Sequence, residues 1–205
     1  MVSQKDGRVT ATRQRILTVA ETLYHQGGYN HISLQVIADQ LQLSKPALFY
    51  HFENKQALFF DLLLTIIEQH RLLLMEVVQQ KEPLARQKLS EIMQQLTQKP
   101  RFDVVRFIHQ EYTLLTADQQ QKVKQAWRSG VLEPVRRVLE EGIHCGDLRP
   151  HRTHLSAYMF LHLCLLTPHI DLMVVSQREQ EDHDEPQEIL LDLFIHGLGL
   201  PSSSY

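Results

Sequence analysis

Four side chains with polar groups cluster among apolar residues between positions 45 and 55. They are Lys45, Tyr50, His51 and Lys55. A lysine in the DNA major groove can donate to O6 and N7 of guanine, and side chains of all three types can bind phosphate oxygens. Their clustering predicts a nucleic-acid contact. The alternative is two ordinary helices of an all-α protein.

Residue types suited to catalysis or metal binding occur elsewhere without the spacing that such sites need. The twelve histidines include His151 close to His154, and His162 close to Cys164 and His169. No HExxH, paired CxxC or carboxylate–histidine cluster accompanies them. The GxSxG, P-loop and GxGxxG motifs do not occur either. We therefore expect neither an enzyme, nor a metal site, nor a cofactor.

Two short predicted helices position the polar cluster, and a serine suited to N-capping precedes each helix. Ser33 and Ser44 are good N-cap residues. Apolar residues placed to form a hydrophobic staple flank each cap, Ile32 with Ile37 around Ser33 and Leu43 with Leu48 around Ser44. Pro46 suits the first turn of the second helix. On the first helix we expect an inward stripe of Val36, Ile37, Ala38 and Leu41, with Gln35, Asp39 and Gln40 facing water.

Two short helices joined by a three- or four-residue turn form a helix-turn-helix, whose second helix can enter a major groove. The segment IADQLQLSKPALFYHFENKQAL resembles the N-terminal signature of the TetR family of transcriptional regulators. The resemblance extends from Arg13 to Leu62. Its matching features are Ser33, Ile37-Ala38, Ser44, the run Leu48-Phe49-Tyr50-His51-Phe52, and Lys55 with Leu58.

Gln42 departs from this pattern, because glycine is usual at that position in the family. If the turn requires a positive φ, a side chain there costs stability.

We expect the second helix to read base edges. Lys45 heads that helix and is best placed to reach guanine, with Gln35 and Ala47 as companions. For Phe49 two roles remain open, a contact with a thymine methyl group and packing within the protein.

Lys55, Tyr50 and His51 are expected at phosphates. The full predicted DNA-binding set is Ser33, Gln35, Ser44, Lys45, Ala47, Phe49, Tyr50, His51 and Lys55.

The composition is that of an ordinary globular protein of 205 residues, 43% hydrophobic and 22% charged. The net charge is −3, yet residues 1–60 hold six lysines and arginines against four acids, which makes that segment +2 and the remainder −5. No signal peptide or membrane span is evident, and Cys145 and Cys164 are too few for a disulfide scaffold. These features favour a cytoplasmic protein.

The fold class expected is all-α, with a helix-turn-helix domain over residues 1–60 and a helical domain over residues 61–205. A long connector helix should join them. The acidic stretch REQEDHDEP is interpreted as a solvated linker. The helices expected outside the helix-turn-helix are Thr10–Gln26, Lys55–Gln80, Leu84–Gln98, Asp103–Leu115, one from an Asp118 cap to Leu139 with a bend near Gly130 and Pro134, His154–Thr167 and Gln187–Leu198.

The last two helices are apolar around more than one face, which fits either a buried core pair or a self-association surface. The family resemblance implies the second, a four-helix bundle about a two-fold axis. The expected interface consists of Ala157, Leu161, Cys164, Leu190, Leu193, Phe194 and Leu198.

The resemblance also implies a small-molecule pocket in the C-terminal helices, although a plain aromatic core would explain the same residues. Its expected lining is Met93, Phe107, His109, Tyr112, Trp127, Phe160 and His162. The sequence therefore predicts a homodimeric repressor of double-stranded operator DNA that a small molecule releases. A small-molecule-binding helical protein whose helix-turn-helix contacts protein is the alternative, and a helical enzyme is a distant third.

Overall fold

The computed structural model describes residues 2–81, 84–98, 107–174 and 186–198, and every regular element in these ranges is helical. The all-α prediction is confirmed. None of the described helices is both long enough and apolar enough to cross a membrane. The elements are α1 (Val2–Gly27), η1 (Tyr29–His31), α2 (Leu34–Leu41), α3 (Lys45–His51), α4 (Lys55–Gln79), α5 (Ala85–Gln98), η2 (Phe107–Glu111), η3 (Tyr112–Leu114), α7 (Ala117–Trp127), η4 (Arg128–Leu132), α8 (Glu133–Cys145), α9 (Thr153–Val174) and α10 (Pro186–Leu198).

The chain divides into two compact units. Unit 1 comprises Met1–Ile67 and Phe102–Ala126, and unit 2 comprises Glu68–Arg101 and Trp127–Tyr205. This division differs from the single cut expected between residues 60 and 61, because a segment from the second half of the chain packs with the N-terminal helices.

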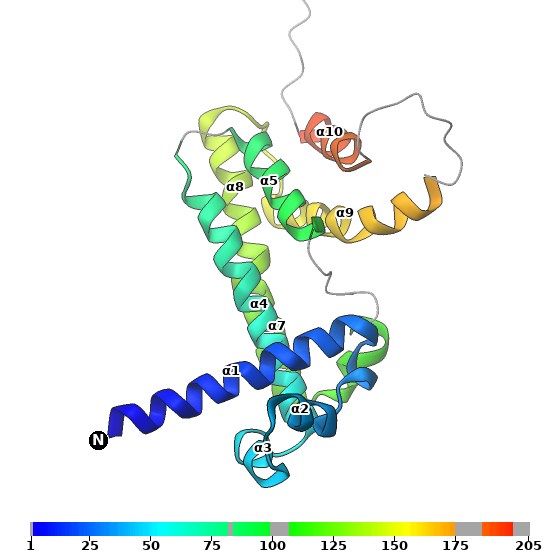
Figure 1. Cartoon of the computed structure of the whole chain (residues 1–205). Helices are drawn as coiled ribbons and strands as arrows, with labels where there is room; N and C mark the ends of the chain where they lie inside the picture. Colours follow the sequence, from blue (N-terminus) through cyan, green and yellow to red (C-terminus); the bar gives the residue numbers. More distant parts are fainter. Residues whose placement is uncertain (1, 82–83, 99–106, 175–185, 199–205) are drawn as a thin grey trace, which may run out of the picture. The chain divides into compact units, whose positions relative to one another are not determined.

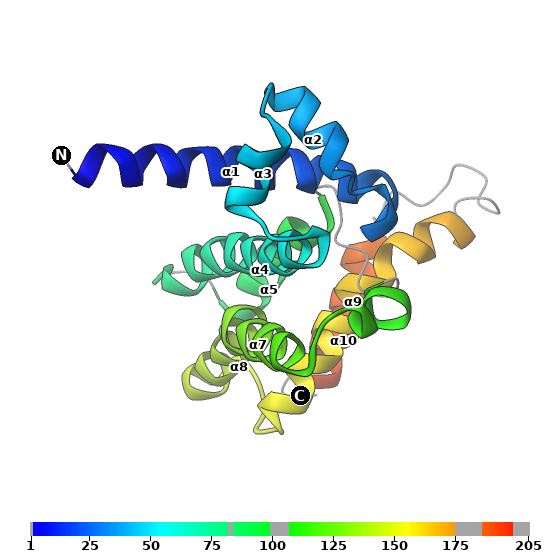
Figure 2. The same cartoon turned by 90° about the horizontal axis from the view of Figure 1, so that it is seen from below.

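Unit 1 is built around α1, with α2 and α3 beside it (Figures 1 and 2). Tyr24 of α1 and Tyr29 of η1 both pack on the Phe59 ring, with centroids 5.7 and 5.0 Å away. The fully buried apolar residues of this core include Ile16, Ala20, Ile37, Leu48, Leu58 and Leu62. Burial of this continuous apolar cluster holds the two short helices on α1 and α4.

Glu111 ties the later segment of unit 1 to its N-terminal helices. The residue is 4% exposed, and its carboxylate accepts hydrogen bonds from the Tyr24 hydroxyl at 2.7 Å and from the Tyr29 N–H at 2.8 Å. A buried carboxylate requires such donors. The sequence pattern gave no sign of this pairing, since the partners are more than 80 positions apart.

Unit 2 is a helical layer in which α5 packs against α8, α9 and α10. Helix α10 lies alongside α9 in both views (Figures 1 and 2). Lys88 of α5 is almost fully buried, and its ammonium lies 2.6 Å from a carboxylate oxygen of Glu141 in α8. The core includes Leu89, Ile92, Met93, Val135, Val138, Leu139, Ala157 and Phe160.

The helix boundaries correct two of the expectations. Helix α7 is capped by Thr116, whose hydroxyl accepts from the Gln119 N–H at 3.3 Å while the Gln119 side chain accepts from the Thr116 N–H at 3.0 Å. This capping box, and not Asp118, begins the helix. The expected bend near Gly130 is a π-helical turn, η4, with Gly130 buried.

The other boundaries lie close to those expected, apart from three segments. Helix α1 begins at Val2, well before the expected Thr10. Helix α9 continues beyond Thr167 to Val174. Within the predicted helix Asp103–Leu115, the described part forms a π-helical turn and a 3₁₀ turn, and residues 103–106 lie outside the described ranges. The predicted linker REQEDHDEP also lies outside them, except for Pro186 at the start of α10.

Candidate nucleic-acid interface

Serine caps begin both helices of the helix-turn-helix, as their sequence signals predict. The Ser33 hydroxyl accepts from the Val36 N–H, and the Ser44 hydroxyl accepts from the Ala47 N–H, each at 3.3 Å. Capping uses an acceptor lone pair of each hydroxyl. The serine O–H therefore keeps its capacity to donate to a phosphate oxygen.

The turn between the helices passes through a left-handed residue. Gln42 has φ 54° and ψ 39°, and its N–H donates to the carbonyl oxygens of Ala38 and Asp39. This is the position where the family pattern has glycine, and a residue with a Cβ is strained there. The turn therefore does require a positive φ, and Gln42 is the one non-glycine residue with this conformation in the described part of the chain.

Helix α3 buries one face and exposes the other. Leu48 is buried in the core of unit 1, whereas Lys45 is exposed, Phe49 is 48% exposed and Tyr50 is 74% exposed. His51 is half-buried, with its ring centroid 5.4 Å from that of Tyr50. An exposed lysine and two exposed aromatic rings on a single two-turn helix form a surface with both hydrogen-bonding and apolar character.

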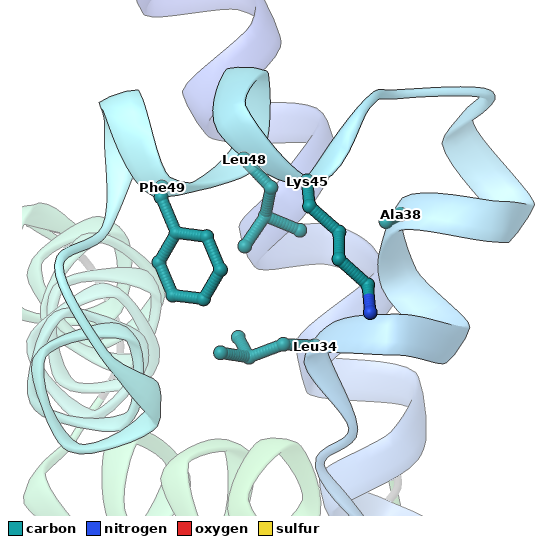
Figure 3. A pocket seen from close by; sticks show the side chains of 5 residues that line it. All are labelled: Leu34, Ala38, Lys45, Leu48 and Phe49. Atoms are coloured by element: carbon teal, nitrogen blue, oxygen red, sulfur yellow. The ribbon is translucent and has the colours of Figure 1, made fainter.

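A hollow of about 160 Å³ opens between α2 and α3 (Figure 3). Leu34, Leu48 and Phe49 surround the same space, and the Lys45 side chain extends along its side opposite Phe49. Ala38 completes the lining. Leu34 belongs to no predicted site, although its position four residues before Ala38 places both on one face of α2.

Two residues of α2 differ from their expected roles. Val36, expected in the buried stripe, is 38% exposed. Gln35 is exposed as predicted, but its amide donates to the Asp39 carboxylate at 2.7 Å, one turn further on. To read a base, Gln35 must exchange that hydrogen bond for one to DNA.

Arg13 holds the C-terminal end of α3. Its guanidinium donates to the His51 carbonyl oxygen at 3.0 Å, forms an ion pair with Asp61, and lies 4.3 Å from the centroid of the Phe52 ring. Burial raises the pKa of Asp61, and the charge and hydrogen bond of Arg13 oppose that rise. All of these contacts engage the Arg13 side chain within unit 1. Arg15 remains exposed.

Lys55 stands at the start of α4 and is half-buried. Asn54 caps the helix by accepting from the Ala57 N–H at 2.8 Å. The Lys55 ammonium lies 4.3 Å from the centroid of the Tyr29 ring and 3.5 Å from the Asn30 carbonyl oxygen. Burial lowers the pKa of Lys55. These contacts fix the side chain at a helix N-terminus, where a phosphate is also stabilised.

The predicted pocket residues fall in both units. Phe107 and Tyr112 belong to unit 1, where their ring centroids are 5.8 Å apart. In unit 2, Trp127 is half-buried against Tyr158 at 5.6 Å between centroids. Met93 and Phe160 are fully buried there, whereas His162 is exposed. The side chain of His109 lies outside the described set.

The structure corrects the list of expected interface residues. Ala157, Leu161, Cys164 and Phe194 are buried within unit 2, where the rings of Phe194 and Phe160 have centroids 5.5 Å apart. Side chains enclosed in a single subunit offer no area to another.

Leu193 is 67% exposed and Leu190 is half-buried, while the Leu198 side chain lies outside the described residues. Among the described side chains of α9 and α10, the large apolar ones that are exposed are Leu155, Met159, Ile189 and Leu193.

Metal-binding residue types remain scattered across the described ranges, where no three His, Cys, Asp or Glu side chains gather into a site. His162 instead places Nδ1 2.8 Å from the Tyr158 carbonyl oxygen of its own helix, and burial raises the pKa of the Cys164 thiol.

Known proteins resemble this chain in sequence and in fold. The family described as bacterial regulatory proteins, tetR family, matches residues 16–62. The uncharacterized HTH-type transcriptional regulator YhgD of Bacillus subtilis (strain 168) is 22% identical over 151 residues, which are 74% of this chain and 79% of that protein.

Two solved structures share the fold over almost the whole chain. The reduced form of E. coli NemR aligns with a TM-score of 0.73 at 19% identity, covering 93% of this chain and 99% of NemR. AibR, solved in complex with isovaleryl coenzyme A and operator DNA, aligns with a TM-score of 0.63 at 20% identity, covering 92% of this chain and 98% of AibR.

Proposed function

The chain belongs to the TetR family of bacterial transcriptional regulators, and from this we propose that it is a homodimeric, cytoplasmic repressor that binds operator DNA and is released by a small molecule. Residues of α2, α3 and the start of α4 contact the DNA, and unit 2 carries the effector site and the dimer surface.

The observation that carries this proposal is the exposed face of α3. Lys45, Phe49 and Tyr50 project from this helix. The buried Leu48, the Ser44 cap and the hydrogen bond from Arg13 to the His51 carbonyl oxygen hold the helix in place. A helix fixed by its buried side and bearing a cation and aromatic groups on the other is suited to a major groove. Lys55, at the N-terminus of α4, adds a phosphate contact.

Dimerisation uses the exposed apolar residues of α9 and α10. Leu155 and Met159 lie one turn apart on α9, and Ile189 and Leu193 lie one turn apart on α10. Since α10 lies alongside α9, two such pairs can form a four-helix bundle about a two-fold axis. A dimer would present two copies of α3 to half-sites one helical turn apart, or multiples of it.

The effector site belongs to the helices of unit 2, where Trp127 and Tyr158 form a half-buried aromatic pair. A ligand with about 2.7 kcal/mol of differential affinity for the non-binding state can shift the equilibrium by up to about a hundredfold. Acyl-coenzyme A esters are a reasonable first screen, because AibR was solved with isovaleryl coenzyme A. Trp127 fluorescence should change saturably with an effector.

A gel-shift with the DNA that flanks the protein's own gene tests the central claim. Specific retardation of that DNA, against a scrambled duplex of equal composition, is the expected result. Loss of the shift on addition of an effector would support the release mechanism. Equal binding to both duplexes across a salt series would contradict sequence-specific regulation.

A further inference from the structure

The hollow between α2 and α3 lies on the part of unit 1 that we assign to DNA (Figure 3). Leu34 and Ala38 of α2 and Leu48 and Phe49 of α3 form its apolar walls, around about 160 Å³. A cavity of about 150 Å³ with similar apolar walls can hold a benzene ring. This hollow is therefore large enough for an apolar group on the edge of a base.

Phe49 forms the open wall of the hollow and Leu48 its buried side. Phe49 is 48% exposed, so much of its ring remains in water when the chain is alone, whereas Leu48 is 1% exposed. Covering exposed aromatic surface with another apolar group is favourable in proportion to the area removed from water. An apolar partner that enters this hollow gains that free energy.

The major groove of DNA offers one apolar group among the four standard bases, the C5-methyl of thymine. We propose that the hollow receives this methyl group, and that Leu34 and Phe49 thereby select thymine at one base pair of each half-site. The inference rests on the DNA-binding function proposed above and assigns it a specificity determinant.

Lys45 determines where that thymine lies within the half-site. Its exposed side chain lines the hollow opposite Phe49, and the two residues are one turn apart on α3. One helical turn advances about 5.4 Å, and successive base pairs are about 3.4 Å apart. The selected thymine therefore lies one or two base pairs from the guanine that Lys45 contacts.

Single replacement of thymine by deoxyuridine tests the inference, because it removes the C5-methyl and keeps the hydrogen-bonding groups. The probe is a duplex that the full-length protein selects from a randomised pool, with each thymine replaced in turn. At one position per half-site we expect binding to weaken about fourfold, the value of one buried methyl-sized group. The other thymines should tolerate the change.

Matched variants connect the effect to the hollow. Phe49→Ala should bind the thymine and deoxyuridine duplexes with equal affinity at that position. Val36→Ala removes an exposed apolar side chain of the same two helices that does not line the hollow, and it should keep the fourfold difference. If Phe49→Ala binds too weakly to measure, Leu34→Ala provides the same comparison.

The possible failures are distinguishable. Selection of no duplex by the wild-type protein would contradict the DNA-binding function itself. Selection of a duplex without any thymine that responds to deoxyuridine would overturn the methyl assignment alone, as expected if the hollow takes a protein segment instead. Persistence of the fourfold difference in both Phe49→Ala and Leu34→Ala would place the methyl contact elsewhere on the protein.

Discussion

The guanidinium of Arg13 donates a hydrogen bond to the backbone carbonyl oxygen of His51, 3.0 Å away. His51 is the last residue of α3, and the final carbonyls of a helix have no partner within it. The same guanidinium pairs with Asp61 of α4 and lies against the Phe52 ring. One side chain of α1 thus fixes the end of the proposed reading helix against α4.

Replacing Arg13 by Met should destabilise unit 1 by about 1–3 kcal/mol, because it removes the partner of a half-buried carboxylate and of a helix carbonyl. The aliphatic stem that lies against Phe52 is retained. Urea unfolding followed by circular dichroism measures the change. Arg15→Met, at an exposed position of the same helix, is the control and should stay within about 0.5 kcal/mol of wild type. Equal stability of both variants would show that the contacts of the Arg13 guanidinium contribute nothing to the free energy of unfolding.

The destabilisation in Arg13→Met should also depend on pH. Burial raises the pKa of Asp61, so its protonated form is favoured by folding, and the stability linked to this group falls as pH rises through the folded pKa. Arg13 opposes the rise, so its removal raises the Asp61 pKa further. The loss of stability should therefore be larger near pH 7 than near pH 4, close to the ordinary aspartate pKa of about 3.9. A loss independent of pH would exclude an electrostatic origin.

Gln42→Gly should stabilise the protein by about 0.5–1 kcal/mol. The substitution relieves a left-handed conformation that glycine adopts without strain, and part of that gain is offset by the greater freedom of glycine in the unfolded chain. Gln40→Gly, in the last turns of α2, is the matched control and should cost about 1 kcal/mol. Thermal unfolding of the two variants compares them directly, and a destabilised Gln42→Gly would show that the side chain makes a compensating contact.

The local features of the helix-turn-helix could be predicted because each depends on residues close in sequence. Ser33, Ser44 and Gln42 act on their own helix termini, through caps at i+3 and through one backbone conformation. The partners of Arg13 and Glu111 could not be predicted in this way. Their contacts join residues 38 to 87 positions apart, and such distances leave no periodic signal.

The sequence pattern also could not predict which face of α9 is buried, and the reason is physical. Periodicity identifies the inward face only when polar residues mark the outward one. On α9 the exposed positions include His154 and His162, but also Leu155 and Met159, which are as apolar as the buried Leu161 and Cys164. The pattern therefore showed that the helix is apolar on more than one face without showing which face lies inside the subunit.

The dimer proposal predicts different outcomes for neighbouring substitutions on α10. Leu193→Glu should weaken dimerisation and leave the subunit folded, because Leu193 is exposed in the single chain and would be desolvated only in the dimer. Phe194→Glu should unfold the subunit, since Phe194 packs on Phe160 in the core. Sedimentation combined with circular dichroism separates the two effects.

Leu72→Glu is the control for the added charge, because Leu72 is 52% exposed on α4 and belongs to neither of the last two helices. It should remain a dimer. A Leu193→Glu variant with the wild-type dimer affinity would place the interface on another surface.

Replacing Lys45 and Lys55 by Met should affect DNA binding in different ways. Lys55→Met keeps the stem that lies over Tyr29 and removes the charge. It should weaken all sequences by similar factors and reduce the slope of log K against log salt by about 1 per half-site. Lys45→Met should instead cost about 1–3 kcal/mol at one base position and relax the preference for guanine there.

Binding of each variant to the operator and to a scrambled duplex, measured across a salt series, distinguishes these two roles. Both substitutions have the same size and remove the same charge, so a difference between them reports the position of the lysine and not the loss of a cation. Lys45 lines the hollow on the exposed side of α3, whereas Lys55 is held at a helix N-terminus. If Lys45→Met weakens both duplexes equally and leaves base preference intact, Lys45 contacts the DNA backbone and another residue of α3 reads the sequence.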